Sequence, residues 1–136
     1  MFTTAPSRFA ESNSTLFSVR APVGAINRAK VRCCIGRGIA SIKAHNDLDS
    51  YIYYLMLSLK KVFDNYNGEG TVFGSINRKS LEEIKIVIPQ TEFALSINNI
   101  FKAHDRRIES LEEENSRLST LRDTLLPKLM SGEIKI

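Results

Sequence analysis

Cationic side chains gather in one acid-free stretch of this 136-residue chain. No Asp or Glu lies between Glu11 and Asp47, and the cations inside that window are Arg20, Arg28, Lys30, Arg32, Arg37 and Lys43. Residues 1–90 carry 12 Lys and Arg against 7 Asp and Glu, a formal charge of +5, whereas residues 91–136 carry 7 against 8, which gives −1. Clustered cations bind phosphates and supply sequence-independent affinity for nucleic acid. A solvated basic face without a ligand is the alternative interpretation.

Side chains that could read bases, and not only bind phosphates, lie beside the predicted turns. Arg and Asn can each make two hydrogen bonds to a guanine or adenine edge, whereas Lys mostly binds phosphate. We therefore predict a DNA-binding set made of Arg20, Arg28, Lys30, Arg37, Ser75, Asn77, Arg78 and Lys79. For each of these residues a solvated surface role stays open.

The chain lacks a recognisable catalytic arrangement. It has no Gly-rich phosphate loop, and neither His45 nor His104 has a nucleophile or a carboxylate at a useful spacing. Two Glu-x-Lys triplets, Glu83-Ile84-Lys85 and Glu133-Ile134-Lys135, resemble part of a metal-dependent nuclease site. Such a site needs a further acidic ligand to hold the metal. We expect no cofactor, no metal site and no enzymatic activity of the chain itself.

Short strands separated by turns are predicted for the first third of the chain. Residues 16–19 precede a turn at residues 22–24, residues 31–35 precede the Gly36 to Gly38 turn, and residues 39–42 follow it. We expect these segments to form a meander. The adjacent Cys33 and Cys34 are interpreted as strand residues, because a metal site would require more ligands at a wider spacing.

A helical period replaces this pattern after residue 46. Apolar residues recur at intervals of three and four, at Leu48, Ile52, Leu55, Leu59 and Val62. We predict one amphipathic helix with Asp47 or Asp49 as its N-cap and Asn67-Gly68 as its end. A polar turn at residues 75–79 and a strand at residues 84–88, ended by Pro89, complete this part of the chain.

A long helix is predicted from about Thr91 to Pro127. A heptad places Ala94, Phe101, Ile108, Asn115, Arg122 and Leu129 at position a and Ile97, His104, Leu111, Leu118 and Leu125 at position d. About 35 residues span roughly 50 Å at 1.5 Å per residue, more than a small domain needs for its own core. We predict pairing with another long helix through Ile97, Phe101, His104, Ile108, Leu111, Asn115, Leu118 and Leu125. The alternative is that the helix folds back on its own domain.

The composition, with 43% hydrophobic and 25% charged residues, is typical of a folded globular chain. No run approaches the roughly 18 consecutive apolar residues of a membrane span. The first 15 residues lack the basic and then apolar order of a signal peptide. We therefore predict a cytoplasmic location.

Several motifs together resemble one protein family. The segments "LFSVRAPVGAINRA", "CCIGRGIASIKA", "YLMLSLKKVFDNYNGEGTVFGSINRKSLEEIKIVIPQ" and "LRDTLLPKLMSGEIKI" look like the C-terminal part of a specificity subunit of a type I restriction-modification system. The resemblance runs from about Leu16 to Ile136. It implies a non-catalytic subunit that reads double-stranded DNA and docks methyltransferase (modification) subunits and, through them, the restriction subunit. It also implies a long conserved helix that pairs with its counterpart and spaces two recognition domains.

The expected fold is α+β: a small partial target-recognition domain with short strands and a helix, followed by a long C-terminal coiled-coil helix. We expect residues 1–14 to be an unmatched N-terminal segment, residues 15–90 the partial recognition domain, and residues 91–136 the dimerisation and spacer helix with its tail. A full specificity subunit has two recognition domains and two conserved helices, so a homodimer with antiparallel helices could restore that symmetry. The alternative is a helix-mediated interaction protein that has lost DNA binding.

Overall fold

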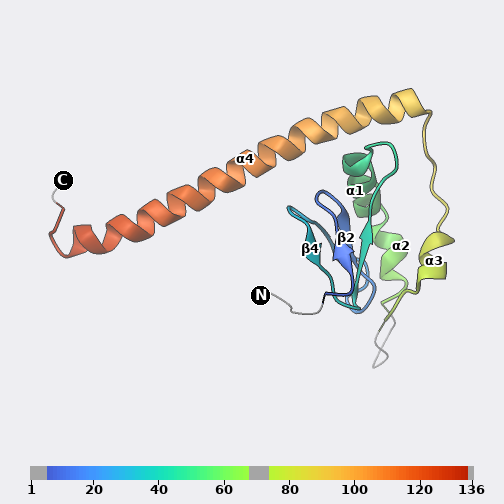
Figure 1. Cartoon of the computed structure of the whole chain (residues 1–136), viewed down its shortest axis with the longest axis horizontal. Helices are drawn as coiled ribbons and strands as arrows, with labels where there is room; N and C mark the ends of the chain where they lie inside the picture. Colours follow the sequence, from blue (N-terminus) through green and yellow to red (C-terminus); the bar gives the residue numbers. More distant parts are fainter. Residues whose placement is uncertain (1–5, 68–73, 135–136) are drawn as a thin grey trace. The chain divides into compact units, whose positions relative to one another are not determined.

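The computed structural model describes residues 6–67 and 74–134 and has the expected α+β fold (Figure 1). Its elements are β1 Phe9–Ala10, β2 Thr15–Ser18, β3 Ile26–Arg28, β4 Cys33–Cys34, β5 Ile39–Ile42, α1 Asp49–Ser58, α2 Lys60–Asp64, α3 Arg78–Glu82 and α4 Thr91–Met130. The chain divides into two units, which we call the globular unit (residues 1–99) and the helical unit (residues 100–136). The helix α4 begins in the first unit and makes up most of the second.

The central strand of the larger sheet is β2, and the strand order is β3-β2-β5. All pairs are antiparallel, with Phe17 opposite both Ile26 and Ala40. The predicted meander is therefore wrong. The segment β4 leaves this sheet and pairs with β1, with Phe9 opposite Cys34, and β5 returns to the free side of β2. The N-terminal segment thus contributes a strand.

The hydrophobic core of the globular unit lies between the larger sheet and the helices. It is formed by Phe17, Val23, Met56, Phe63 and Ile76. The rings of Phe17 and Phe63 meet edge to face with their centroids 4.7 Å apart, a favourable arrangement for two aromatic rings. Figure 1 shows α1, α2 and α3 on the same side of the strands. This packing fixes α3, and with it the polar segment that precedes it, relative to the sheet.

The single helix predicted after residue 46 is divided into α1 and α2 at Leu59. Leu59 has φ −83° and ψ 8°, so the α1 hydrogen-bond ladder ends there and a new short helix begins. Asn67 does not end a helix either. Its side-chain oxygen accepts a hydrogen bond from the Val23 N–H at 2.6 Å, and its side-chain nitrogen donates to the Val23 carbonyl at 3.2 Å.

The predicted N-cap of this segment is also wrong. The residue at the N-cap is Leu48, whose side chain makes no capping hydrogen bond. Asp49 is the first residue of α1, and its Oδ1 accepts a hydrogen bond from the Ala44 N–H at 2.9 Å. Asp47 has φ 56°, a left-handed conformation that Asp tolerates better than most residues.

The predicted strand at residues 84–88 is not a strand in the structure. Its side chains alternate as a strand requires, yet Val87 is 90% exposed and Ile88 58% exposed. No described strand lies beside the segment to complete a ladder, and hydrogen bonding between strands is what defines a sheet.

The helix α4 begins at Thr91, as predicted, but continues through Pro127 to Met130. Pro127 lies in the last turn and has no N–H to donate to the carbonyl of residue 123, so the helix continues there with one intrahelical hydrogen bond missing. The end is set by Gly132, whose φ of 75° suits glycine, and by a hydrogen bond from the Ile134 N–H to the Lys128 carbonyl. Among the residues described, no helix combines the length and the apolar character needed to cross a membrane.

Candidate nucleic-acid interface

The predicted DNA-binding residues separate into two groups at opposite ends of β2. Thr15, the first residue of β2, lies opposite Arg28, and Ser18, the last, lies opposite Ile39. Arg28 and Lys30 are therefore near the start of β2. The remaining members gather beyond its end, and we call them the Arg20 cluster: Arg20, Arg37, Ser75, Asn77, Arg78 and Lys79.

Backbone hydrogen bonds bring three separate segments together in the Arg20 cluster. Arg20 and Ser75 form an isolated antiparallel β-bridge. Beside it, the Ile76 N–H donates to the Val19 carbonyl at 3.0 Å, and the Val19 N–H donates to the Gly38 carbonyl at 2.9 Å. The turn that contains Arg37 and the segment that leads into α3 are thus both joined to the end of β2.

Asn77 fixes the local geometry of this cluster by capping α3. It has an extended backbone, with φ −89° and ψ 168°, and its side-chain oxygen accepts a hydrogen bond from the Ser80 N–H at 2.8 Å. This is the usual role of Asn at an N-cap. The cap uses only the side-chain oxygen of Asn77, so its side-chain NH2 group is the donor that could reach a base edge.

Arg78 and Lys79 project from the first turn of α3 and are exposed. Arg78 Nε lies 2.7 Å from Glu82 Oε1, and Lys79 Nζ lies 4.0 Å from Glu83 Oε1. The hydrogen bond that Arg78 Nε donates to Glu82, together with the negative charge of Glu82, raises the pKa of Arg78. Exposed pairs of this kind contribute little to stability, so they can exchange for phosphates at small cost.

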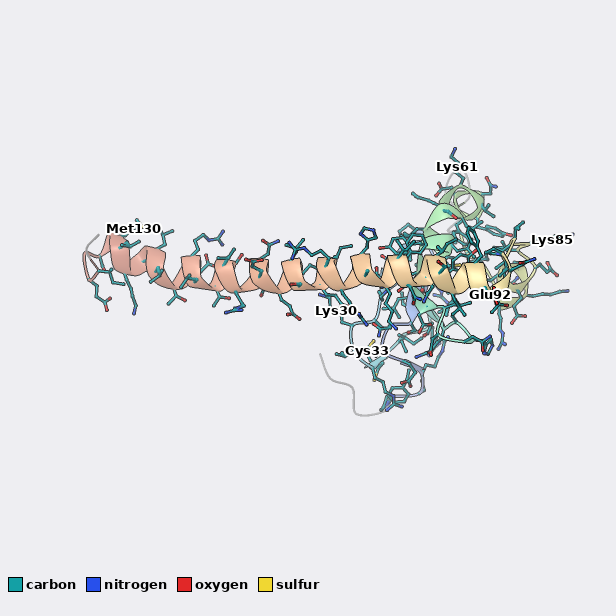
Figure 2. All side chains as sticks on the ribbon, turned by 90° about the horizontal axis from the view of Figure 1, so that it is seen from above. Lys30, Cys33, Lys61, Lys85, Glu92 and Met130 are labelled. Atoms are coloured by element: carbon teal, nitrogen blue, oxygen red, sulfur yellow. The ribbon has the colours of Figure 1, made fainter. Side chains whose placement is uncertain are left out.

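Arg28 has a structural contact that sequence reasoning missed. Its guanidinium lies over the ring of Tyr53 in α1, 4.2 Å from the centroid. Arg28 is half-buried, whereas Lys30 is exposed. Figure 2 shows Lys30 and Cys33 on one side of the globular unit and Lys61 on the other. Only the periodicity of the α1 segment could have hinted at Tyr53, since the stacking depends on how α1 packs against β3.

Three further basic side chains accompany the cluster along a groove beside β5. The groove has a volume of about 910 Å³, and Arg8, Lys43 and His45 line it together with Asn77 and Arg78. Arg8 lies outside the acid-free window of the sequence, so no local charge signal marked it. Lys43 lies inside that window, and its Nζ is 4.0 Å from Asp49 Oδ2.

No group of three His, Cys, Asp or Glu side chains within residues 6–67 and 74–134 is arranged to hold a metal ion. Glu83, from the first Glu-x-Lys triplet, ends α3 and pairs with Lys79. The second triplet ends at Lys135, which lies outside the described residues.

The predicted pairing residues differ in exposure along α4. Ile97, in the globular unit, and Phe101 are half-buried, and His104 and Asn115 are exposed. Further along, the exposed fractions are 49% for Ile108, 41% for Leu111, 55% for Leu118 and 37% for Leu125. The helical unit thus carries an uncovered apolar stripe on an otherwise charged helix, whose side chains Figure 2 shows projecting outward.

Comparisons with known proteins agree on one family. The sequence pattern of the type I restriction modification DNA specificity domain matches residues 7–120, which include β1. The putative type I restriction enzyme MjaX specificity subunit of Methanocaldococcus jannaschii is 35% identical over 137 residues, which cover 100% of this chain and 32% of that protein. This chain therefore spans about a third of the length of that relative.

Solved structures give the same result. A chain from a study of complex assembly and conformational transition of the type I R-M system is 28% identical with a TM-score of 0.63, over 93% of this chain and 33% of that one. The S subunit of a type I restriction-modification system from M. genitalium has a TM-score of 0.73 at 21% identity, over 90% of this chain and 33% of that one, and shows the shared fold. The chain therefore belongs to the type I restriction modification DNA specificity domain family.

Proposed function

We propose that this chain acts as a DNA sequence-specificity subunit that pairs through α4 and docks methyltransferase subunits and, through them, a restriction subunit in the cytoplasm. The observation that carries the proposal is the β-bridge between Arg20 and Ser75. It joins segments far apart in the sequence and so brings Ser75, Asn77, Arg78 and Lys79 to the end of β2 where Arg20 lies. The hydrogen bond from the Val19 N–H to the Gly38 carbonyl adds the turn that contains Arg37.

The chemistry of the Arg20 cluster fits duplex DNA. Arg20, Arg37 and Arg78 each offer a planar guanidinium with several donors, which matches a phosphate or the paired acceptors of guanine. Asn77 offers a side-chain NH2 group beside them, while Lys79 suits a phosphate. All five side chains are exposed, so they need no rearrangement of the core to reach a ligand.

The paired arrangement follows from the apolar stripe of α4. A two-fold pair of identical chains would present two copies of the Arg20 cluster, and the length of α4 would set the distance between two half-sites. Family membership supports the docking of methyltransferase subunits. The chain spans about a third of the length of its relatives, so this docking stays a proposal.

Duplex binding as a function of salt concentration tests the DNA-reading part. We expect log K to fall linearly with log salt for a labelled duplex of about 30 base pairs, measured by fluorescence anisotropy, and the slope to shrink by about one unit in Arg20→Ala or Arg78→Ala. Lys61→Ala is the matched control, because Lys61 is an exposed cation of α2 outside the predicted set.

Two outcomes would count against DNA reading. Equal slopes in Arg20→Ala, Arg78→Ala and Lys61→Ala would place the phosphate contacts elsewhere. Little binding to duplex at any salt concentration, with a methyltransferase subunit still retained in a pull-down, would favour the alternative of a scaffold that has lost DNA binding.

A further inference from the structure

The groove beside β5 is bordered by two strand-like segments that, among the described residues, have no neighbouring strand on the side of the groove. One is β5 itself, at the edge of the sheet order β3-β2-β5. The other is residues 84–88, of which Ile84 and Ile86 line the groove. An edge strand presents unpaired N–H and C=O groups, which are a template for a further strand.

The register shows which backbone groups of β5 face the groove. The Val19 N–H donates to the Gly38 carbonyl, which makes Ser18–Ile39 and Leu16–Ser41 the non-hydrogen-bonded pairs of the antiparallel ladder. The backbone N–H and C=O of Ser41 therefore point away from β2. All of residues 39–43 line the groove, which agrees with this edge facing it, since alternate side chains of a strand point to opposite faces.

The opposite wall has the side-chain pattern of a strand. Ile84, Ile86 and Ile88 alternate with Lys85 and Val87, and β-branched residues favour extended pairing. Ile84 packs against the hydrophobic core, which holds this wall in place. Among the described residues, no backbone hydrogen bond to another segment is recorded for residues 85–88.

The lining of the groove defines the side chains that an occupant should carry. Of its 20 lining residues 13 are apolar, including Ile52, Leu55 and Met56 of α1. Its charged members are the cations Arg8, Lys43 and Arg78 and a single carboxylate, Glu82. Apolar side chains are therefore needed on the inner face of an occupant and acidic ones toward the rim.

We propose that this groove binds an extended, alternately apolar and acidic peptide segment of a partner protein, which adds as a strand between β5 and residues 84–88. Main-chain hydrogen bonds to Ser41 would supply affinity, and the apolar floor and cationic rim would supply specificity. A second copy of the chain fits less well, because it would bring the same cations to the groove. Duplex DNA fits less well, because phosphates gain nothing from an apolar floor. The proposal does not depend on the DNA-reading function.

The test uses a labelled peptide of about eight residues, within the usual length of a strand, in which Val and Glu alternate. We expect it to bind the wild-type chain and Ser41→Ala alike, as measured by fluorescence anisotropy, and to bind Ser41→Pro at least about tenfold more weakly. Both variants lose the contact of Ser41 Oγ with Ser14 Oγ, 3.0 Å away, but only Ser41→Pro also loses the outward N–H.

Peptide variants keep the test decisive if Ser41→Pro does not fold. A Val-Glu peptide with N-methyl groups at alternate residues lacks the ladder donors, and a Val-Lys peptide reverses the charge, so both should bind the wild-type chain at least about tenfold more weakly. Equal binding of these variants, or no binding of the Val-Glu peptide, would overturn the proposal. If Ser41→Pro instead halves the mass of a wild-type dimer, the occupant is a second copy and the proposal is wrong.

Discussion

Asn98 of α4 caps the N-terminus of α1 by accepting a hydrogen bond from the Tyr51 N–H, 2.9 Å away. Its Nδ2 also donates to the Asp47 carbonyl at 3.1 Å, and the side chain is only 3% exposed. The N-cap residue Leu48 has no side-chain acceptor, so Asn98, which is 47 positions from Tyr51 in the sequence, supplies the acceptor that α1 lacks. This contact fixes the first turns of α4 within the globular unit.

Replacing Asn98 should therefore destabilise the globular unit. We expect Asn98→Ala to lower the free energy of unfolding by about 1–2 kcal/mol, because the Tyr51 N–H and the Asp47 carbonyl lose the partner of two part-buried hydrogen bonds. Asn99→Ala is the matched control, since Asn99 is the exposed next residue of the same helix. Urea denaturation of both variants measures the difference, and equal losses would contradict a capping role.

Gly24 should not tolerate a side chain. It has φ +83°, and a Cβ built on it would lie 2.6 Å from Phe63 Cβ in the core. We expect Gly24→Ala to cost at least about 2 kcal/mol of unfolding free energy, from the left-handed conformation and from overpacking. Gly36→Ala, where a Cβ would meet nothing within 4 Å, should change it by less than about 0.5 kcal/mol. Thermal denaturation of the two variants compares them directly.

The stacking of Arg28 on Tyr53 should be measurable as a coupling energy. A double-mutant cycle with Arg28→Met and Tyr53→Leu should give about 0.5–1 kcal/mol in urea denaturation. Lys30→Met, which removes an exposed cation nearby, should leave stability almost unchanged. An additive cycle would show that the contact of Arg28 with Tyr53 does not stabilise the packing of α1 on β3.

Local sequence patterns predicted the elements that carry a clear apolar period in their own residues. The period of three and four residues marked the start of α4 at Thr91, and Leu16 and Phe17 marked the strand that became β2. The strand β3 was missed because its sequence, Ile-Asn-Arg, has a single apolar residue. Residues 84–88 have an equally clear strand pattern, but no strand in the described part of the chain pairs with them, and a strand exists only when it is paired.

The candidate interface depended on contacts that no local pattern contains. Charge alone selected the cations, and turn chemistry selected Ser75 and Asn77. Antiparallel pairing places Arg28 at the start of β2, away from the Arg20 cluster at its end. A β-bridge between segments that are distant in the sequence brings Arg20 beside Ser75. The burial of Arg28 against Tyr53 likewise depends on helix packing.

The pairing of α4 stays a prediction that one measurement can decide. Ile108 and Leu111 are 49% and 41% exposed in the single chain, and burying the exposed part of such a side chain contributes about 1 kcal/mol. Light scattering should therefore give the mass of a dimer for the wild-type chain and of a monomer for the Ile108→Asp, Leu111→Asp double variant. Ser110→Asp with Ser116→Asp adds the same two charges outside the a and d positions and should leave the dimer intact. A monomeric wild-type chain, or equal dissociation of both double variants, would mean that the apolar stripe does not pair two copies, and two identical half-sites could not then arise through α4.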